Sequence, residues 1–216
     1  MIHLVKGPEP QILATNGAAW LKVLEDKIAA GQVPTDAEKS RYRKAEIKAA
    51  LVAETHGKCA YCESYLLHIA FGDVEHISPK SLKLSDSFRW DNLTLACDRC
   101  NTYKKDAVGI VDPYIEDPDE FFIFLGPMIF ARPEIAKAII TVRQLRLNRS
   151  ELIESRFKRL DAISNLILII QRTNDPAIRE VLIQDLFENE IGDQAEFAAF
   201  ARSFVKAIEP GLAVAA

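Results

Sequence analysis

Two stretches, Cys59-Ala-Tyr-Cys62 and Cys97-Asp-Arg-Cys100, decide the fold of this 216-residue chain. The sequence contains four cysteines, and all of them lie in these two Cys-x-x-Cys pairs. Each pair can present two thiolates from a tight turn, and four thiolates suit the tetrahedral coordination of structural zinc. Disulfides and a thioredoxin-like redox pair are weaker alternatives, because a chain of this size needs no disulfides and neither pair lies in a visible βαβ unit. We therefore expect one structural Zn²⁺, bound by Cys59, Cys62, Cys97 and Cys100.

A zinc ion with four thiolate ligands has no open coordination position, so any chemistry must come from polar residues near the two pairs. Cleavage of a phosphodiester needs a base that deprotonates water and a cation that neutralises the developing charge. His76 is a suitable base, because a neutral imidazole accepts a proton near neutral pH. Glu75 and Asn101 offer oxygen ligands suited to Mg²⁺ or Mn²⁺. Lys104 follows Asn101 by one helical turn and would face the same phosphate.

Each of these residues also has a simpler explanation, because a lone Glu-His pair is common on surface strands and an asparagine can cap a turn or a helix. They occur in a fixed order, however: Asp73-Val-Glu-His-Ile-Ser-Pro-Lys80, Asn92-Leu93 and Cys97-Asp-Arg-Cys-Asn-Thr-Tyr-Lys104. This order resembles the HNH endonuclease family and its ββα-metal fold. The resemblance implies that Asn92 is the middle asparagine of the motif, which braces the loop between the strands and helps to orient the histidine.

A wider resemblance covers most of the chain. The further matching motifs are Lys6-Gly-Pro-Glu-Pro10, Glu46-Ile-Lys-Ala-Ala-Leu51, Gly57-Lys-Cys-Ala-Tyr-Cys62, Asp112-Pro-Tyr114 and Leu145-Arg-Leu-Asn148. Together they resemble the HNH subunit of Septu-type antiphage systems, which is also found beside some retrons. The likeness is strongest from residue 57 to 112, and Ser78 stands where an arginine is expected in many relatives. The resemblance implies a companion ATPase subunit and a nuclease that is triggered during phage infection.

The sequence predicts a mixture of helices and short strands. Helices are expected at about 18–30 and 35–57, strands at 66–71, 74–77 and 93–96, a short helix at about 98–107, a hairpin over 121–130, and three or four helices after Pro133. The predicted fold class is α+β, with a small zinc-stapled ββα-metal core embedded in a mostly helical chain. We expect an N-terminal helical segment (1–57), the nuclease core (58–112) and a hairpin with helices (113–216). The last segment either docks a partner or packs on the nuclease, and the sequence favours neither.

The composition is ordinary for a globular protein, with 49% hydrophobic residues. No apolar run reaches the roughly 18 residues of a membrane-spanning helix, and the first residues lack a signal peptide's features, so we expect no membrane partner and a cytoplasmic location. The net charge is −4, yet one stretch is rich in basic residues: Lys39, Arg41, Arg43, Lys44, Lys48 and Lys58. These side chains can contact phosphate, although charge alone favours a solvated helix face.

We therefore expect a metal-dependent HNH endonuclease that hydrolyses DNA or RNA, tRNA included, as the nuclease of an antiphage defence complex. An alternative function is a catalytically inactive, zinc-ribbon-like module that binds nucleic acid or protein. Such a module has no use for Glu75, His76 and Asn101 at these positions. A sequence-specific enzyme that acts alone is disfavoured, because the sequence shows no helix-turn-helix or zinc-finger array.

Overall fold

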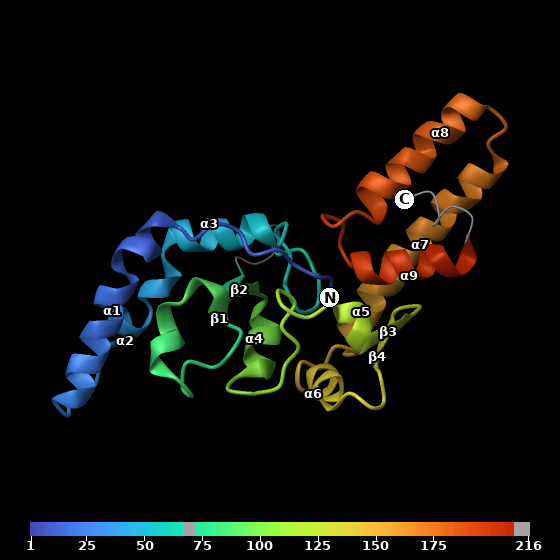
Figure 1. Ribbon diagram of the computed structural model, residues 1–216. Coiled ribbons are helices and arrows are strands. Elements are labelled where there is room, and N and C mark those ends of the chain that lie inside the picture. The colour runs from blue at the N-terminus through green and yellow to red at the C-terminus, as the bar shows by residue number, and fades with distance from the viewer. Residues whose placement is uncertain (67–71, 210–216) are drawn as a thin grey trace.

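Two antiparallel strands and one short helix form the centre of residues 1–112, the N-terminal lobe (Figure 1). Strand β1 (Asp73–His76) pairs with β2 (Leu93–Ala96), with His76 opposite Leu93. Helix α4 (Asp98–Lys104) follows β2 almost directly and packs against β1. All four residues of β2 are buried, which explains why this strand reads as an apolar run. The arrangement is a ββα unit.

This computed structural model describes residues 1–66 and 72–209, and it confirms the predicted α+β fold class. The strand expected at 66–71 lies, apart from Leu66, outside the described residues. The hairpin expected over 121–130 is present as β3 (Phe122–Leu125) and β4 (Met128–Ala131), joined by a turn in which Gly126 has a φ of +55°.

The N-terminal helices pack on the ββα unit. They are α1 (Gln11–Ala29), α2 (Asp36–Lys39) and α3 (Ala45–Glu54). Helix α1 begins earlier than the predicted residue 18, directly after Pro10, whose fixed φ suits a helix start. The sheet lies between α3 and α4 (Figure 1), and α3 contributes the fully buried Ile47 and Leu51 to the core.

The single helix predicted from 35 to 57 is wrong, because the structure interrupts it. Thr35 forms the expected capping box with Glu38, but α2 ends at Lys39 and a 3-10 turn, η1 (Arg41–Arg43), follows. The interruption turns Tyr42 into the interior, where its ring packs edge-to-face on His76 with the ring centroids 4.5 Å apart. A tertiary contact therefore overrides the helix propensity of the basic residues around it.

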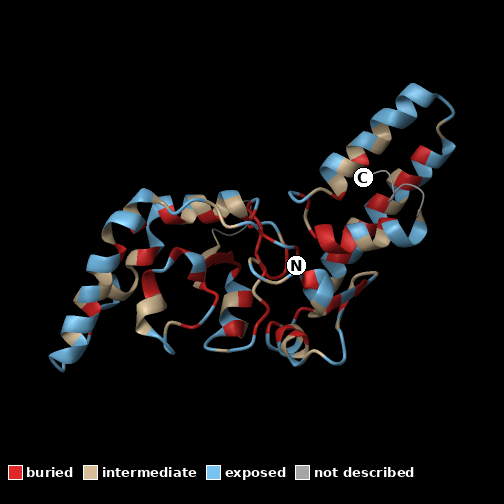
Figure 2. Cartoon of the chain, viewed as in Figure 1, coloured by how far each residue is buried: buried red, intermediate tan, exposed pale blue. Residues whose placement is uncertain are grey.

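The C-terminal lobe, residues 113–209, contains the β3–β4 hairpin and several helices. Helix α5 (Pro118–Phe121) precedes the hairpin. After the hairpin come α6 (Ala136–Gln144), α7 (Ser150–Arg172), α8 (Pro176–Asp185), the π turn η4 (Leu186–Glu190) and α9 (Ala198–Ile208). Helices α7 and α8 point away from the ββα unit (Figure 1), and α8 has no buried residue (Figure 2). In the described ranges no helix has both the length and the apolar character for crossing a membrane.

The start of α9 and the residues before it pack on the first cysteine turn. Lys58 is buried, and its Nζ donates a hydrogen bond to the carbonyl of Ala195 over 2.8 Å. Glu63 is also buried and accepts a hydrogen bond from the amide of Ala199 at 3.2 Å. These contacts join residues more than 130 positions apart. Such contacts are expected if the C-terminal segment packs on the nuclease core. A docking role for the exposed α7–α8 pair stays a prediction.

Candidate active site and metal centre

The four cysteine sulfurs converge in the interior. Their Sγ atoms all lie within 4.8 Å of one another, and those of Cys62 and Cys97 are 3.9 Å apart. A tetrahedral zinc site with Zn–S bonds of about 2.3 Å has sulfur–sulfur distances of about 3.8 Å. The four cysteines are free thiols, without disulfide bonds. The geometry therefore fits one structural zinc ion with four cysteine ligands and no open coordination position, as the sequence predicts.

Local backbone geometry delivers both pairs to this point. Helix α3 ends with His56 and Gly57 in the left-handed region, with φ values of +53° and +70°, and this turn directs the chain into Cys59. The second pair uses the start of α4, where Cys97 is the N-cap residue and its sulfur accepts the Cys100 amide at 3.3 Å.

Two arginines of the C-terminal lobe lie beside the sulfurs. Arg149 donates to the sulfur of Cys100 over 3.9 Å. Arg156 is buried, stacks on the ring of Phe200 at 3.9 Å and donates to the Leu147 carbonyl at 2.7 Å. Burial lowers the pKa of Arg156 to about 10, while the thiolate of Cys62 opposes that shift. The guanidinium groups offset the negative charge that four thiolates carry around one zinc ion.

His76 stands at the end of β1 and is buried. Its Nε2 lies 3.0 Å from the carbonyl oxygen of Ser87. Since a carbonyl can only accept, Nε2 carries the hydrogen and Nδ1 keeps its lone pair. Burial lowers the pKa of His76 to about 4, and the nearby charges of Lys80, Lys104 and Arg43 add to the effect. The ring is therefore neutral at neutral pH.

Asn92 braces the loop that follows β1. Its Oδ1 accepts the amide of Ser78 at 2.8 Å, and its Nδ2 donates to the carbonyls of Ser78 and Asp86 at 3.0 and 3.1 Å. Asp86 is the neighbour of Ser87, whose carbonyl holds His76. The asparagine thus reaches the histidine through the loop, which is the geometry expected for the middle residue of the motif.

Lys104 has a different environment from the one expected of a phosphate contact. Its side chain is 0% exposed, and Nζ donates to Oε1 of Glu75 at 3.0 Å and to the carbonyl of His76 at 2.7 Å. Burial raises the pKa of Glu75, and the ammonium of Lys104 counteracts that shift. Lys104 lies under the motif rather than at its surface, so it can position Glu75 but cannot touch a phosphate in this conformation.

Asp73 is a site residue that the sequence analysis missed. Asn101 donates a hydrogen bond from Nδ2 to Oδ2 of Asp73 at 2.9 Å and makes no contact of this kind with Glu75. Asp73 and Glu75 share the half-buried face of β1, because side chains two residues apart in a strand point the same way. This period of two was the signal that could have found Asp73. Asp73 and Asn101 are thus in contact where β1 faces α4, and Glu75 lies on the same face of β1.

Comparison with known proteins shows which family the cysteine-containing segment resembles. Residues 59–107 match the family described as HNH endonuclease. This chain carries an HNH endonuclease domain. The predicted family resemblance is confirmed, and the matched segment contains both cysteine pairs together with the candidate base and metal ligands.

Two curated relatives share the name Septu protein PtuB. The protein from Bacillus mycoides (strain KBAB4) is 24% identical over 64% of this chain and 63% of its own length. The protein from Bacillus thuringiensis is 30% identical over 55% of this chain and 44% of its own length. The matches therefore span less than two thirds of the first relative's length and less than half of the second's.

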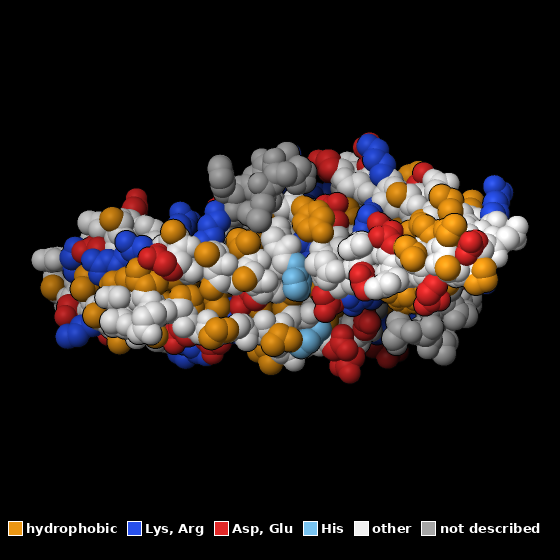
Figure 3. Space-filling view, turned by 90° about the horizontal axis from the view of Figure 1, so that it is seen from above, with side chains coloured by type: hydrophobic (Ala, Val, Ile, Leu, Met, Phe, Trp, Pro, Cys, Tyr) orange, Lys and Arg blue, Asp and Glu red, His pale blue; other side chains and the backbone are white. Residues whose placement is uncertain are grey.

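Basic residues of the N-terminal segment flank the HNH domain. Figure 3 shows Lys and Arg side chains at the end of the molecule that the N-terminal helices form. Next to His76, Lys80 donates to the hydroxyl of Tyr42 at 3.2 Å, and Arg43 lies over the ring of Tyr42 at 5.5 Å. Neither cation forms an ion pair with a carboxylate in the described part of the chain. By contrast, Lys58 is buried against the C-terminal lobe, so the basic stretch does not act as one surface.

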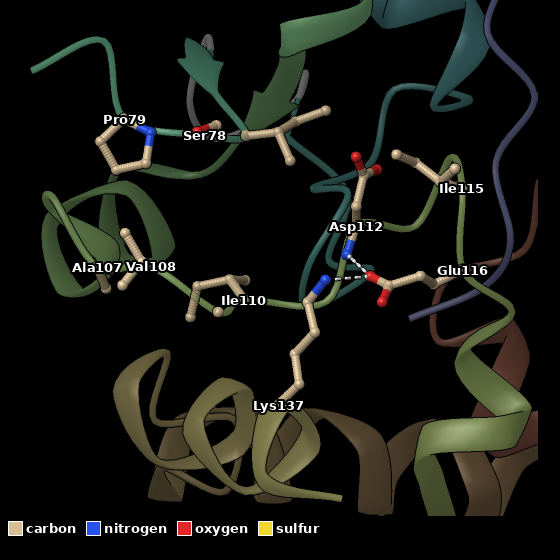
Figure 4. Close-up of a pocket in the computed structure, with 11 residues that line it drawn as sticks. Ser78, Pro79, Ala107, Val108, Ile110, Asp112, Ile115, Glu116 and Lys137 are labelled. Carbon is tan, nitrogen blue, oxygen red and sulfur yellow. Dashed lines mark hydrogen bonds and ion pairs between the residues drawn. The ribbon is translucent and has the colours of Figure 1, made fainter. Parts of the chain in front are cut away.

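A pocket of about 420 Å³ borders the HNH domain on its C-terminal side (Figure 4). It contains Ser78 of the motif, and Lys137 of α6 forms an ion pair with Glu116 at 2.6 Å across it. The same Glu116 oxygen accepts the amide of Asp112 at 2.8 Å. These interactions connect α6 to the segment that follows the HNH domain.

Proposed function

We propose that this protein is a metal-dependent endonuclease that hydrolyses phosphodiester bonds of DNA or RNA. The observation that carries the proposal is the orientation of His76. The Ser87 carbonyl holds Nε2–H, and Nδ1 makes no hydrogen bond within the described residues. A packing histidine would have both ring nitrogens satisfied, whereas a general base needs one of them free. Nδ1 can take the proton of a water molecule that attacks the phosphorus.

The other residues have supporting roles in this proposal. Asp73, Glu75 and Asn101 would hold Mg²⁺ or Mn²⁺ through oxygen atoms, which are the ligands these ions prefer. When bound, the ion supplies the positive charge that stabilises the pentavalent phosphorus and the leaving oxygen. Lys104 positions Glu75, and Asn92 positions the loop that orients His76. A zinc ion on the four cysteines would tie the first cysteine turn to the junction of β2 and α4.

The biological setting is proposed from the relatives. Both are named Septu protein PtuB, so we propose that the chain is the nuclease of an antiphage defence complex, with an ATPase subunit as its partner. We further propose that it acts in the cytoplasm, a reducing compartment that keeps cysteines available for zinc.

One observation favours the second candidate, an inactive binding module. The carboxylate of Glu75 is already paired with the buried ammonium of Lys104, which reduces the negative charge available to a metal ion. A module that only binds nucleic acid would keep the zinc centre and lose cutting.

Cleavage assays separate the two candidates. Zinc-loaded protein is incubated with plasmid DNA or total tRNA, with Mg²⁺, with Mn²⁺ or with neither, and in the presence or absence of the ATPase. We expect metal-dependent cutting that His76→Ala abolishes and His3→Ala, a change of an exposed histidine, leaves intact. Binding without cutting under every condition would establish the module and refute the endonuclease.

A further inference from the structure

A second pocket lies where the HNH domain meets the C-terminal lobe. It has a volume of about 570 Å³ and is lined by Tyr103 of α4 and by residues at the junction of α6 and α7, including Arg143, Arg146 and Arg149. Tyr103 lies two residues beyond the candidate metal ligand Asn101, so the two side chains are on different faces of α4 and the pocket is separate from the candidate metal ligands. Both lobes contribute residues to the pocket.

The pocket concentrates positive charge in an acidic protein. Besides its three arginines, Arg99 lies close enough to the pocket residue Glu151 to lower the pKa of that carboxyl, although hydrogen bonds are the larger cause. Among the described residues none of the four arginines forms an ion pair with a carboxylate, and Glu151 is the one acid in the lining. Surface cations without such partners, gathered in a concave site, are typical of phosphate binding.

Arg146 has a left-handed backbone conformation that is unfavourable for a residue with a side chain. Helix α6 ends when the amide of Leu147 bonds to the carbonyl of Val142, and Arg146 occupies the left-handed position with a φ of +48°. Glycine is the residue usually found at this position, because it has no side chain to strain. The arginine side chain instead lies over the ring of Tyr103, 4.6 Å from its centroid. This stacking holds the guanidinium beside Tyr103 in the lining of this open pocket.

We propose that this arginine pocket binds the phosphate backbone of the nucleic acid that the HNH domain cuts, and so extends the substrate path onto the C-terminal lobe. The inference rests on the proposed nuclease function. Guanidinium groups match phosphate oxygens in pairs of hydrogen bonds, and an aromatic ring beside them accommodates a base. Arg143 and Arg146 are exposed, with the Arg146 guanidinium held over Tyr103, whereas Arg149 is half-buried and donates to the sulfur of Cys100.

Binding measurements test the pocket without cleavage. Fluorescence anisotropy is recorded for labelled single-stranded DNA, duplex DNA and an RNA hairpin with His76→Ala protein, over a series of salt concentrations. The test variant adds Arg143→Gln and Arg146→Gly. The control adds Arg172→Gln and Arg179→Gln, which removes the same charge from α7 and α8. Melting curves of all proteins show whether the fold is intact.

We expect the test variant to bind at least one labelled nucleic acid about tenfold more weakly than the control. The slope of log affinity against log salt should also fall by about two, at roughly 0.9 per lost phosphate contact on duplex DNA. Arg146→Gly alone should melt no lower than its parent, since glycine relieves the strain. Equal affinity and equal slope in test and control proteins would overturn the pocket, and so would binding of inorganic phosphate there without any effect on nucleic acid.

The two proposals fail in different ways. Wild-type protein that binds through the pocket but never cuts would refute the endonuclease and keep the pocket. Wild-type cutting that persists undiminished in the Arg143→Gln/Arg146→Gly protein, with unchanged binding, would refute the pocket and keep the endonuclease.

Discussion

At the scale of single residues, Asn92 influences His76 through the loop that contacts both of them. Its three side-chain hydrogen bonds hold the loop whose Ser87 carbonyl selects the tautomer of His76. Asn92→Ala should lower the cleavage rate about 10- to 100-fold, a loss of about 1–3 kcal/mol of the kind expected when buried partners lose their hydrogen bonds. Zinc content should stay unchanged. Nitrogen NMR of the His76 ring should show that Nε2–H is no longer the single tautomer.

The matched control for this prediction is Asn165→Ala, which removes an exposed asparagine on α7. An Asn92→Ala protein that keeps both the wild-type rate and the single tautomer would show that the loop needs no such brace.

Lys104 gives a prediction about stability. The ammonium is fully buried between Glu75 and the His76 carbonyl, so Lys104→Met leaves a half-buried carboxylate without its counter-charge. Breaking a buried pair by removing one partner costs about 3–5 kcal/mol. Chemical denaturation should reveal a loss of this size. The control Lys158→Met removes a lysine whose pair with Glu154 is exposed and should change the stability by less than about 1 kcal/mol. Similar stability of the two variants would contradict the structural role of Lys104.

The site residues were predictable to different degrees. The cysteines were predicted from their spacing, His76 from the chemistry that cleavage needs, and Asn92 only from the resemblance to the HNH family. The environment of Lys104 could not be predicted, because a helix of seven residues shows no period long enough to tell which face turns toward β1. Asp73 was within reach, since it precedes Glu75 by the two-residue period of a strand.

At the scale of elements, the entry into β1 depends on Gly72. Its φ is +62°, and a Cβ there would lie 2.8 Å from a methyl carbon of Leu66 and 3.2 Å from one of Leu95. Gly72→Ala therefore combines backbone strain with a clash against the core. Gly31 offers a matched control, because its φ is +70° but a Cβ would meet nothing within 4 Å.

We expect Gly31→Ala to cost about 1 kcal/mol from the backbone alone, and Gly72→Ala to cost a further 1–3 kcal/mol from overpacking. Thermal or chemical denaturation of both variants measures the difference. Equal losses would mean that Leu66 and Leu95 move aside freely and that the strand entry is not tightly packed.

The elements themselves were predicted unevenly. The hairpin and the two motif strands follow from apolar segments bounded by turn residues. The interruption between α2 and α3 does not, because Arg41, Arg43 and Lys44 are good helix formers. What breaks the helix is the burial of Tyr42 against His76, a contact between segments that sequence periodicity does not connect.

At the scale of the whole molecule, the two lobes meet around the four-cysteine cluster. Lys58 and Glu63 flank the first cysteine pair and bond to Ala195 before α9 and to Ala199 in the first turn of α9, and Arg149 of the C-terminal lobe bonds to Cys100. Structural zinc binding is coupled to folding, so Cys97→Ser should lose zinc and release the C-terminal segment. Metal analysis and hydrogen exchange at the Ala199 amide measure both effects.

Ser203→Ala is a suitable control for the exchange experiment, because its hydroxyl bonds to the Phe124 carbonyl within the C-terminal lobe and not to the zinc centre. A zinc-free Cys97→Ser protein in which Ala199 stays protected would show that the lobes hold together without the metal. The sequence could not predict this junction, because Lys58 and Glu63 meet partners more than 130 residues away.

The central claim is that Nδ1 of His76 is the general base of a nuclease, and chemical rescue tests it most directly. His76→Gly leaves a cavity of the size of the lost ring while the zinc centre stays intact. The variant should not cut in Mg²⁺ or Mn²⁺, and added imidazole should restore part of the cleavage in proportion to its concentration. Cleavage by His76→Gly at the wild-type rate without imidazole would contradict the account.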